Sequence, residues 1–151
     1  MDTTLEITRS SRKVMLHFIE SLSLEQLNTV PPGYNNNIIW NIGHCIVVHQ
    51  MLVYKLSGLP MMISDEMVNK YKRGTRPEGA ADQSEVDRIK TLLFSTIDKT
   101  REDISANIFQ NYQPFTTMSG FELRDAATAM EFNNYHEGVH TGVMMSLRKF
   151  I

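Results

Sequence analysis

The sequence predicts a single all-α domain, folded as a four-helix bundle. Apolar residues recur at helical spacing in long stretches, and proline- or glycine-containing breaks separate these stretches. The chain of 151 residues is long enough for one hydrophobic core. Its 42% hydrophobic and 21% charged residues are typical of a globular protein. We therefore expect one domain over residues 1–151, with a long connection between the second and third long helices.

The first long helix is predicted from about residue 4 to Leu22, because apolar side chains repeat there at helical spacing. These side chains are Val14, Met15, Phe18, Ile19 and Leu22. Ser23–Gln26 follows with the pattern of a capping box, which opens a short helical turn. Pro31-Pro32-Gly33 ends that turn.

The second long helix, from approximately Asn37 to Ser57, is apolar nearly all round. Asn35–Asn37 are cap-type residues before it, and Gly58 and Pro60 close it. A helix without a polar face is usually buried on several sides. In a small bundle this predicts a second contact surface, and a homodimer is the simplest way to supply one.

The C-terminal half is predicted to hold the other two long helices. After a helical turn at Ser64–Tyr71, a third helix starts near Ser84. The segment Phe115–Thr117 has the character of a brief extended piece. Ser119–Glu122 has the pattern of a second capping box, so we expect the fourth helix to run from there to Lys149.

Composition argues against several partners. The 15 basic and 17 acidic residues give a net charge of −2, without the basic surface that nucleic acid requires. Ile38–Leu56 is the most apolar stretch, but polar residues interrupt it, so no membrane span is expected. The N-terminus lacks an apolar signal core, and Cys45 is the lone cysteine. We expect a cytoplasmic protein in which Cys45 is a buried, inert thiol.

The motif His136-Glu137-Gly138-Val139-His140 places two imidazoles on one face of the fourth helix. The same face carries apolar residues, namely Ala129, Phe132, Val143 and Leu147. Both imidazoles therefore point inward, where a shared metal ion would remove the cost of burying them unpaired. The alternative is that one histidine is exposed and the other is hydrogen-bonded in the core.

The motif also reads as H-E-x-x-H, the zinc-protease pattern in which the glutamate is a general base. None of the 11 residues after His140 is His, Asp, Glu or Cys, so a third ligand must come from earlier in the chain. His44 and His49 both lie on the second helix, rotated from each other by about 140°. Spacing alone leaves the choice open. His17 is expected at the rim or surface.

Other residues near the histidines have weaker signals. Glu137 lies about 100° round the helix from His136, so we expect it at the rim or beside the ligands, as a candidate general base. Trp40 and Asn41 are expected to shape the pocket, with helix packing and local hydrogen bonding as the alternatives. Gly43, Gly138 and Gly142 are expected to allow close approach of helices near the ligands. Arg73 and Arg76 are weak candidates for binding an anionic substrate.

Three segments resemble DinB-like proteins. They are Asn37-Ile-Ile-Trp-Asn-Ile-Gly-His44, Tyr71-Lys-Arg-Gly-Thr-Arg-Pro77 and His136-Glu-Gly-Val-His-Thr-Gly142. They resemble most the branch with W-N-x-G-H in the second helix and H-E-x-x-H-x-G in the fourth. The resemblance implies a four-helix bundle, often dimeric, with a three-histidine site for a divalent metal such as zinc or nickel. Its ligands fall on His44, His136 and His140, and this decides against His49.

Three imidazoles leave at least one coordination position for water or a small-molecule substrate, as in catalytic metal sites. Some relatives in the wider superfamily resemble thiol transferases or isomerases that use low-molecular-weight thiols such as bacillithiol or mycothiol. Others resemble metal-dependent hydrolases. The resemblance thus implies a metal-dependent enzyme of one of these kinds. The alternative is a non-catalytic bundle in which the ion only stabilises the fold or a dimer.

Overall fold

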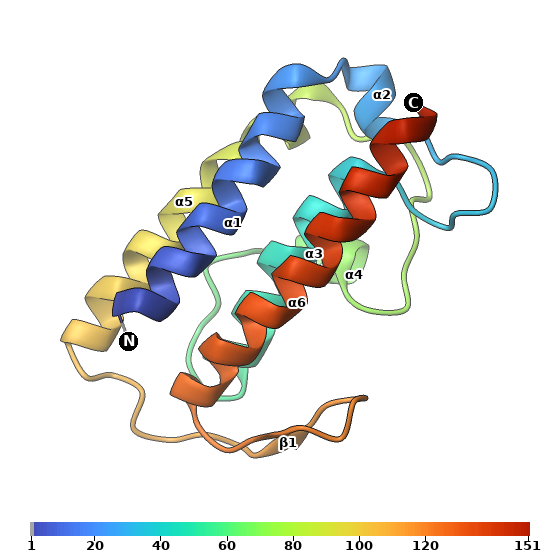
Figure 1. Ribbon diagram of the computed structural model, residues 1–151. Helices are drawn as coiled ribbons and strands as arrows, with labels where there is room; N and C mark the ends of the chain where they lie inside the picture. The colour runs from blue at the N-terminus through green and yellow to red at the C-terminus, as the bar shows by residue number, and fades with distance from the viewer. Residues whose placement is uncertain (1) are drawn as a thin grey trace.

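The computed structural model describes residues 2–151, and four long helical segments lie side by side in it (Figure 1). These segments are α1 (Asp2–Ser21), α3 (Ile38–Gln50) with its π-helical continuation η1 (Met51–Lys55), α5 (Gln83–Ser105) and α6 (Ala126–Leu147). Helix α1 packs against α5 and α6, and α3 packs against α5 and α6. The all-α prediction is confirmed.

Short elements connect the long helices. They are α2 (Leu24–Asn28), α4 (Asp65–Tyr71), an antiparallel hairpin of β1 (Phe115–Thr116) and β2 (Glu122–Leu123), and the 3-10 turn η2 (Arg148–Phe150). Helix α4 lies in the long connection between α3 and α5, where it packs on α3. Among residues 2–151, none of the helices has both the length and the apolar composition that a membrane span requires.

The predicted caps of α2 and α3 are confirmed. At α2, the Gln26 amide donates to Ser23 Oγ at 3.1 Å and the Ser23 amide donates to Gln26 Oε1 at 2.9 Å, which completes the capping box. At α3, the Trp40 amide donates to Asn37 Oδ1 at 2.9 Å. These side chains pair backbone N–H groups that have no partner inside a helix. The Asn37 cap fixes the residue at which α3 begins, and thus the position of His44 in the fold.

The predicted start of α6 at Ser119–Glu122 is wrong, because these residues turn the hairpin. Gly120 has a φ of +80° that favours glycine, and the Thr117 amide donates to the Phe121 carbonyl at 2.9 Å. Asp125 is the true cap, since its Oδ1 accepts from the Thr128 amide at 2.7 Å. A Ser-x-x-Glu pattern cannot cap a helix whose first turn pairs as a strand.

Helix α3 is enclosed by its own chain. Twelve of its 13 residues are buried, and α2, α4, α5 and α6 all pack on it. The lack of a polar face therefore reflects burial on several sides, as expected, and it does not require a second subunit. The exposed large apolar side chains lie elsewhere, several of them on α6 and the hairpin.

Candidate metal centre

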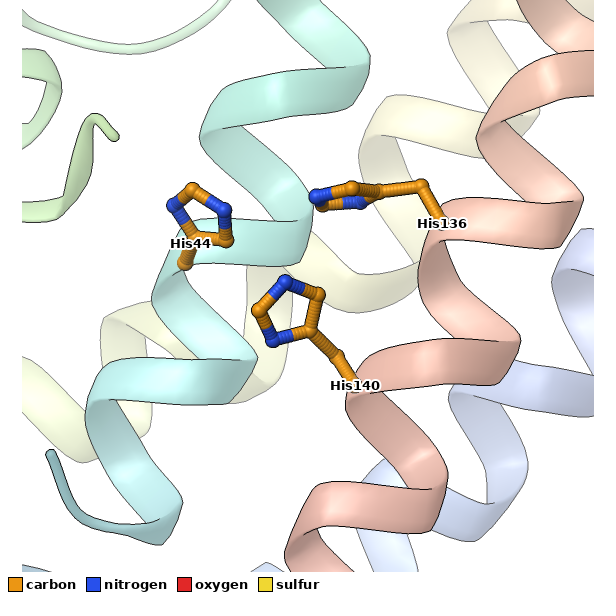
Figure 2. Close-up of side chains that lie close together, drawn as sticks. All are labelled: His44, His136 and His140. Atoms are coloured by element: carbon orange, nitrogen blue, oxygen red, sulfur yellow. The ribbon is translucent and has the colours of Figure 1, made fainter. Parts of the chain in front are cut away.

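Helices α3 and α6 bring His44, His136 and His140 together (Figure 2). One ring nitrogen from each imidazole lies within 4.8 Å of those from the other two. The ring centroids are 5.1 Å apart for His44 and His136, 4.7 Å for His44 and His140, and 4.5 Å for His136 and His140. Figure 2 shows each ring turning a nitrogen toward the space between the three.

Local packing fixes the ring of His44. Its Nδ1 lies 2.6 Å from the Tyr71 carbonyl oxygen, which can only accept, so Nδ1–H is the donor and Nε2 stays free. The Trp40 ring stacks on the imidazole with centroids 4.7 Å apart and planes inclined by 11°. Gly43 lets α4 approach, because a Cβ there would lie 2.6 Å from the Tyr71 ring. The close approach expected at Gly43 is confirmed, and Trp40, which was expected to shape the pocket, contacts the His44 ring directly.

The two imidazoles of α6 differ in how they are held. His140 Nδ1 lies 2.7 Å from Asn41 Oδ1, across the boundary between α6 and α3. The buried Nδ1 atom of His136 has no hydrogen-bond partner in the described part of the chain. The protein thus supports the rear nitrogens of His44 and His140 but not that of His136.

Burial keeps the three imidazoles neutral. Burial, followed by the neighbouring His140 and His44 imidazoles, lowers the pKa of His136 to about 3. Burial, followed by His44, lowers the pKa of His140 to about 4. Burial also lowers the pKa of His44, against the opposing effect of the Tyr71 carbonyl. All three are therefore neutral at pH 7, each with one nitrogen free of a proton, which is the form that binds metal ions.

Glu137 points away from the histidines, and its expected position at the rim is wrong. The side chain is completely buried, and its Oε1 accepts from Arg12 Nε at 3.1 Å and Arg12 Nη2 at 3.0 Å. Asn133 Nδ2 donates to the same oxygen at 2.9 Å. Arg12 also donates to Thr96 Oγ1 at 2.7 Å, so the ion pair joins α1, α5 and α6.

The other histidines and the cysteine lie outside the cluster. His49 is buried, with its ring edge toward Tyr54 at a centroid distance of 6.4 Å, and it is not among the converging ligand atoms. His17 is exposed on α1, as expected. Cys45 is fully buried, as expected, and burial raises the pKa of its thiol well above the usual value, which favours the uncharged thiol.

The remaining expectations have mixed outcomes. Gly138 and Gly142 face open space, so the close helix packing expected of them is wrong within this chain. Arg73 and Arg76 are exposed on the loop after α4, where Arg76 lines a groove with Val30 and Tyr34. The loop touches the centre through Thr75, whose hydroxyl accepts from Trp40 Nε1 at 3.3 Å.

Two partners of the site were not found from the sequence. Arg12 occupies the buried stripe of α1 with Leu5, Thr8 and Met15, and a charged residue in that register was a usable signal for a buried ion pair. The acceptor from Tyr71 is a backbone carbonyl, so no side-chain pattern could have indicated it.

The fold and the cluster together define a class, an all-helical protein with three inward imidazoles on two facing helices. Such imidazoles are the means by which helical bundles build metal sites. Residues 7–144 match the DinB superfamily, and the chain therefore belongs to the DinB superfamily. The matched segment includes His44, His136 and His140. No curated protein matches the chain.

Proposed function

We propose that this chain is a four-helix bundle that binds a divalent metal ion, zinc or nickel, through His44, His136 and His140. The convergence of three neutral imidazoles from two facing helices carries the proposal. Nitrogen ligands suit both metals. Hydrogen bonds to the rear nitrogens of His44 and His140 leave the forward nitrogens free, as metal sites in proteins require.

We further propose that the protein is a metal-dependent enzyme acting on a small molecule, either a thiol transferase or a hydrolase. Three protein ligands leave a position where a bound metal acts as a Lewis acid and acidifies water or a thiol. Two considerations favour thiol transfer with a low-molecular-weight thiol. Arg12 and Asn133 engage Glu137 on a neighbouring face of α6, so its carboxylate is already hydrogen-bonded there. A free thiol has a pKa of about 8.5, against 15.7 for water, so it depends less on a protein base.

The test is elemental analysis of the purified protein, followed by cobalt substitution and activity assays. We expect about one metal ion per chain and a visible cobalt spectrum that changes when a thiol is added. A chelator should abolish turnover of thiol and electrophile while leaving far-UV helicity largely intact, because helix packing carries most of the stability. Unfolding on chelation, with a cobalt spectrum that ignores added ligands, would instead establish the non-catalytic bundle.

We also propose that the homodimer forms through the outer face of α6. Phe121 stacks on Phe132 with centroids 5.9 Å apart, and Phe132 contacts Tyr135 at 5.6 Å. Tyr135 is 63% exposed, and Val139, one turn further, is 49% exposed. Exposed apolar side chains that gather in this way favour association. Sedimentation should give a wild-type dimer and a Val139→Glu monomer; a wild-type monomer at micromolar concentration would exclude the dimer.

A further inference from the structure

The side chain of Asn41 joins the two helices that carry the histidines. Asn41 lies in the first turn of α3 and is completely buried. Its Oδ1 lies 2.7 Å from His140 Nδ1 on α6. Its Nδ2 lies 2.7 Å from the Asn37 carbonyl oxygen and 2.9 Å from Asn36 Oδ1. Both ends of the amide thus form hydrogen bonds, one to His140 on α6 and two to neighbouring residues of the same chain segment.

The local contacts determine which way the amide points. Both partners on one side, the Asn37 carbonyl and Asn36 Oδ1, are acceptors, so the donating Nδ2 group must face them. The opposite atom, Oδ1, therefore faces His140, and it can only accept. His140 Nδ1 must carry the proton. The nitrogen left with a free lone pair is Nε2, and Figure 2 shows the forward nitrogen of this ring turned toward His44 and His136.

We propose that Asn41 is a positioning residue that fixes the tautomer and the ring orientation of His140 before a metal ion arrives. This inference rests on the proposed metal-binding function. Without an acceptor at Oδ1, the imidazole has no partner that selects the Nδ1–H tautomer or holds the ring plane. Outer hydrogen bonds of this kind typically contribute about 10- to 100-fold to metal affinity. Asn41 therefore helps His140 without touching the metal.

The two ends of the amide can be separated by substitution. Asn41→Asp keeps an oxygen acceptor toward His140 but replaces the donor with an oxygen that faces two other oxygens. It should lower the free energy of unfolding while preserving the hold on His140. Asn41→Leu removes both ends. A purely structural role predicts that both variants weaken metal binding alike, whereas a positioning role predicts that only Asn41→Leu does.

The experiment uses ¹⁵N NMR of the histidine rings in the metal-free protein and Zn²⁺ affinity by competition with a chelating dye. We expect wild-type His140 in the Nδ1–H form, and loss of that preference in Asn41→Leu with about 10- to 100-fold weaker Zn²⁺ binding. Asn41→Asp should keep both the tautomer and the affinity. Asn28→Leu is the matched control, because within the described residues the Asn28 side chain pairs with backbone groups of Leu24 and Ala81, away from the histidines, and its loss should affect stability alone.

An Nε2–H form of His140 in the wild-type protein would overturn the proposal, as would an Asn41→Asp variant that binds Zn²⁺ as weakly as Asn41→Leu. The tautomer is measured without metal, so it is independent of the proposed function. A wild-type protein with His140 in the Nδ1–H form that binds no metal refutes the metal site and still supports the pairing of Asn41 with His140.

Discussion

Helix α6 carries two polar clusters on neighbouring faces, and the two clusters are built in opposite ways. His136 and His140 face α3, while Glu137 turns toward Arg12 on α1. The Arg12 cluster is closed, because the guanidinium donates hydrogen bonds to Glu137, to Thr96 and to the Leu93 carbonyl. The histidine cluster is open, because each ring turns a nitrogen toward a shared space (Figure 2).

The difference shows what one motif can encode. Arg12 and Glu137 neutralise each other's buried charge, and their hydrogen bonds join α1 to α6. Neutral imidazoles have no counter-charge to bind, so their forward nitrogens remain available to a ligand. The spacing of H-E-x-x-H places the two histidines together, but it does not place the glutamate with them. In this chain the tertiary partner of Glu137 is Arg12, so the motif joins a candidate metal site to a structural ion pair.

The largest effect is expected from removing a histidine of the open cluster. His44→Ala, His136→Ala and His140→Ala should each lose most of the bound metal, because two ligands cannot replace three. His49→Ala and His17→Ala are the controls and should keep it. Elemental analysis after dialysis measures the result. Full metal content in any of the first three variants removes that residue from the site.

Breaking the closed cluster should change stability rather than metal content. Arg12→Met or Glu137→Gln leaves a buried charge without its partner and should lower the free energy of unfolding by about 3–5 kcal/mol. The double variant Arg12→Met/Glu137→Leu should recover much of this loss, since a well-packed apolar pair can replace a buried ion pair. Urea unfolding of the metal-free proteins gives the values.

The same variants decide the role of Glu137. If Glu137 serves only in the ion pair with Arg12, the folded Glu137→Gln variant should keep about one metal ion per chain and retain turnover. Loss of turnover with unchanged stability would instead establish Glu137 as the general base of the reaction.

Much of the fold followed from local patterns. The Ser23 and Asn37 caps were visible because each depends on side chains within three residues along the chain. Ser119–Glu122 carried the same kind of pattern and failed, because Gly120 and the pairing with β1 imposed a turn instead. A local pattern predicts a helix start only where no other pairing competes for the same backbone groups.

The site could be predicted only in part. The pair His136 and His140 followed from helix geometry, but spacing could not choose between His44 and His49, and the family resemblance selected His44. The structure places His49 among core side chains, away from the other two. The partners of Glu137 and His140 lie 125 and 99 residues away in sequence, and no local pattern specifies contacts of that range.

The open cluster should also make the metal-free protein sensitive to acid. The pKa is lowered to about 3 for His136 and about 4 for His140, whereas the unfolded chain takes up these protons near pH 6.5. Below pH 6.5 the unfolded state binds more protons, so the free energy of unfolding falls as pH falls. The slope is about 1.4 kcal/mol per pH unit for each imidazole that stays neutral.

Comparison with His136→Gln isolates this effect from the carboxylates, which titrate in both proteins. Denaturant unfolding from pH 7 to pH 4.5 should show a shallower loss of stability in the variant. Equal slopes would mean that His136 titrates in the folded protein as it does in the unfolded chain.

The smallest effects are expected from adding one methyl group to a glycine on each helix of the site. In Gly43→Ala the new Cβ would lie 2.6 Å from Cδ1 of Tyr71, and the Tyr71 hydroxyl is anchored to Glu85 Oε1 at 2.6 Å. The ring cannot simply swing away, so the Tyr71 carbonyl that holds His44 must shift. We expect about tenfold weaker Zn²⁺ binding.

In Gly138→Ala the Cβ meets open space, and the helix should gain about 0.5–1 kcal/mol in stability without any change in Zn²⁺ affinity. Thermal unfolding and dye competition on both variants test this contrast. Unchanged Zn²⁺ affinity in Gly43→Ala would show that the contact of α4 with α3 does not position His44.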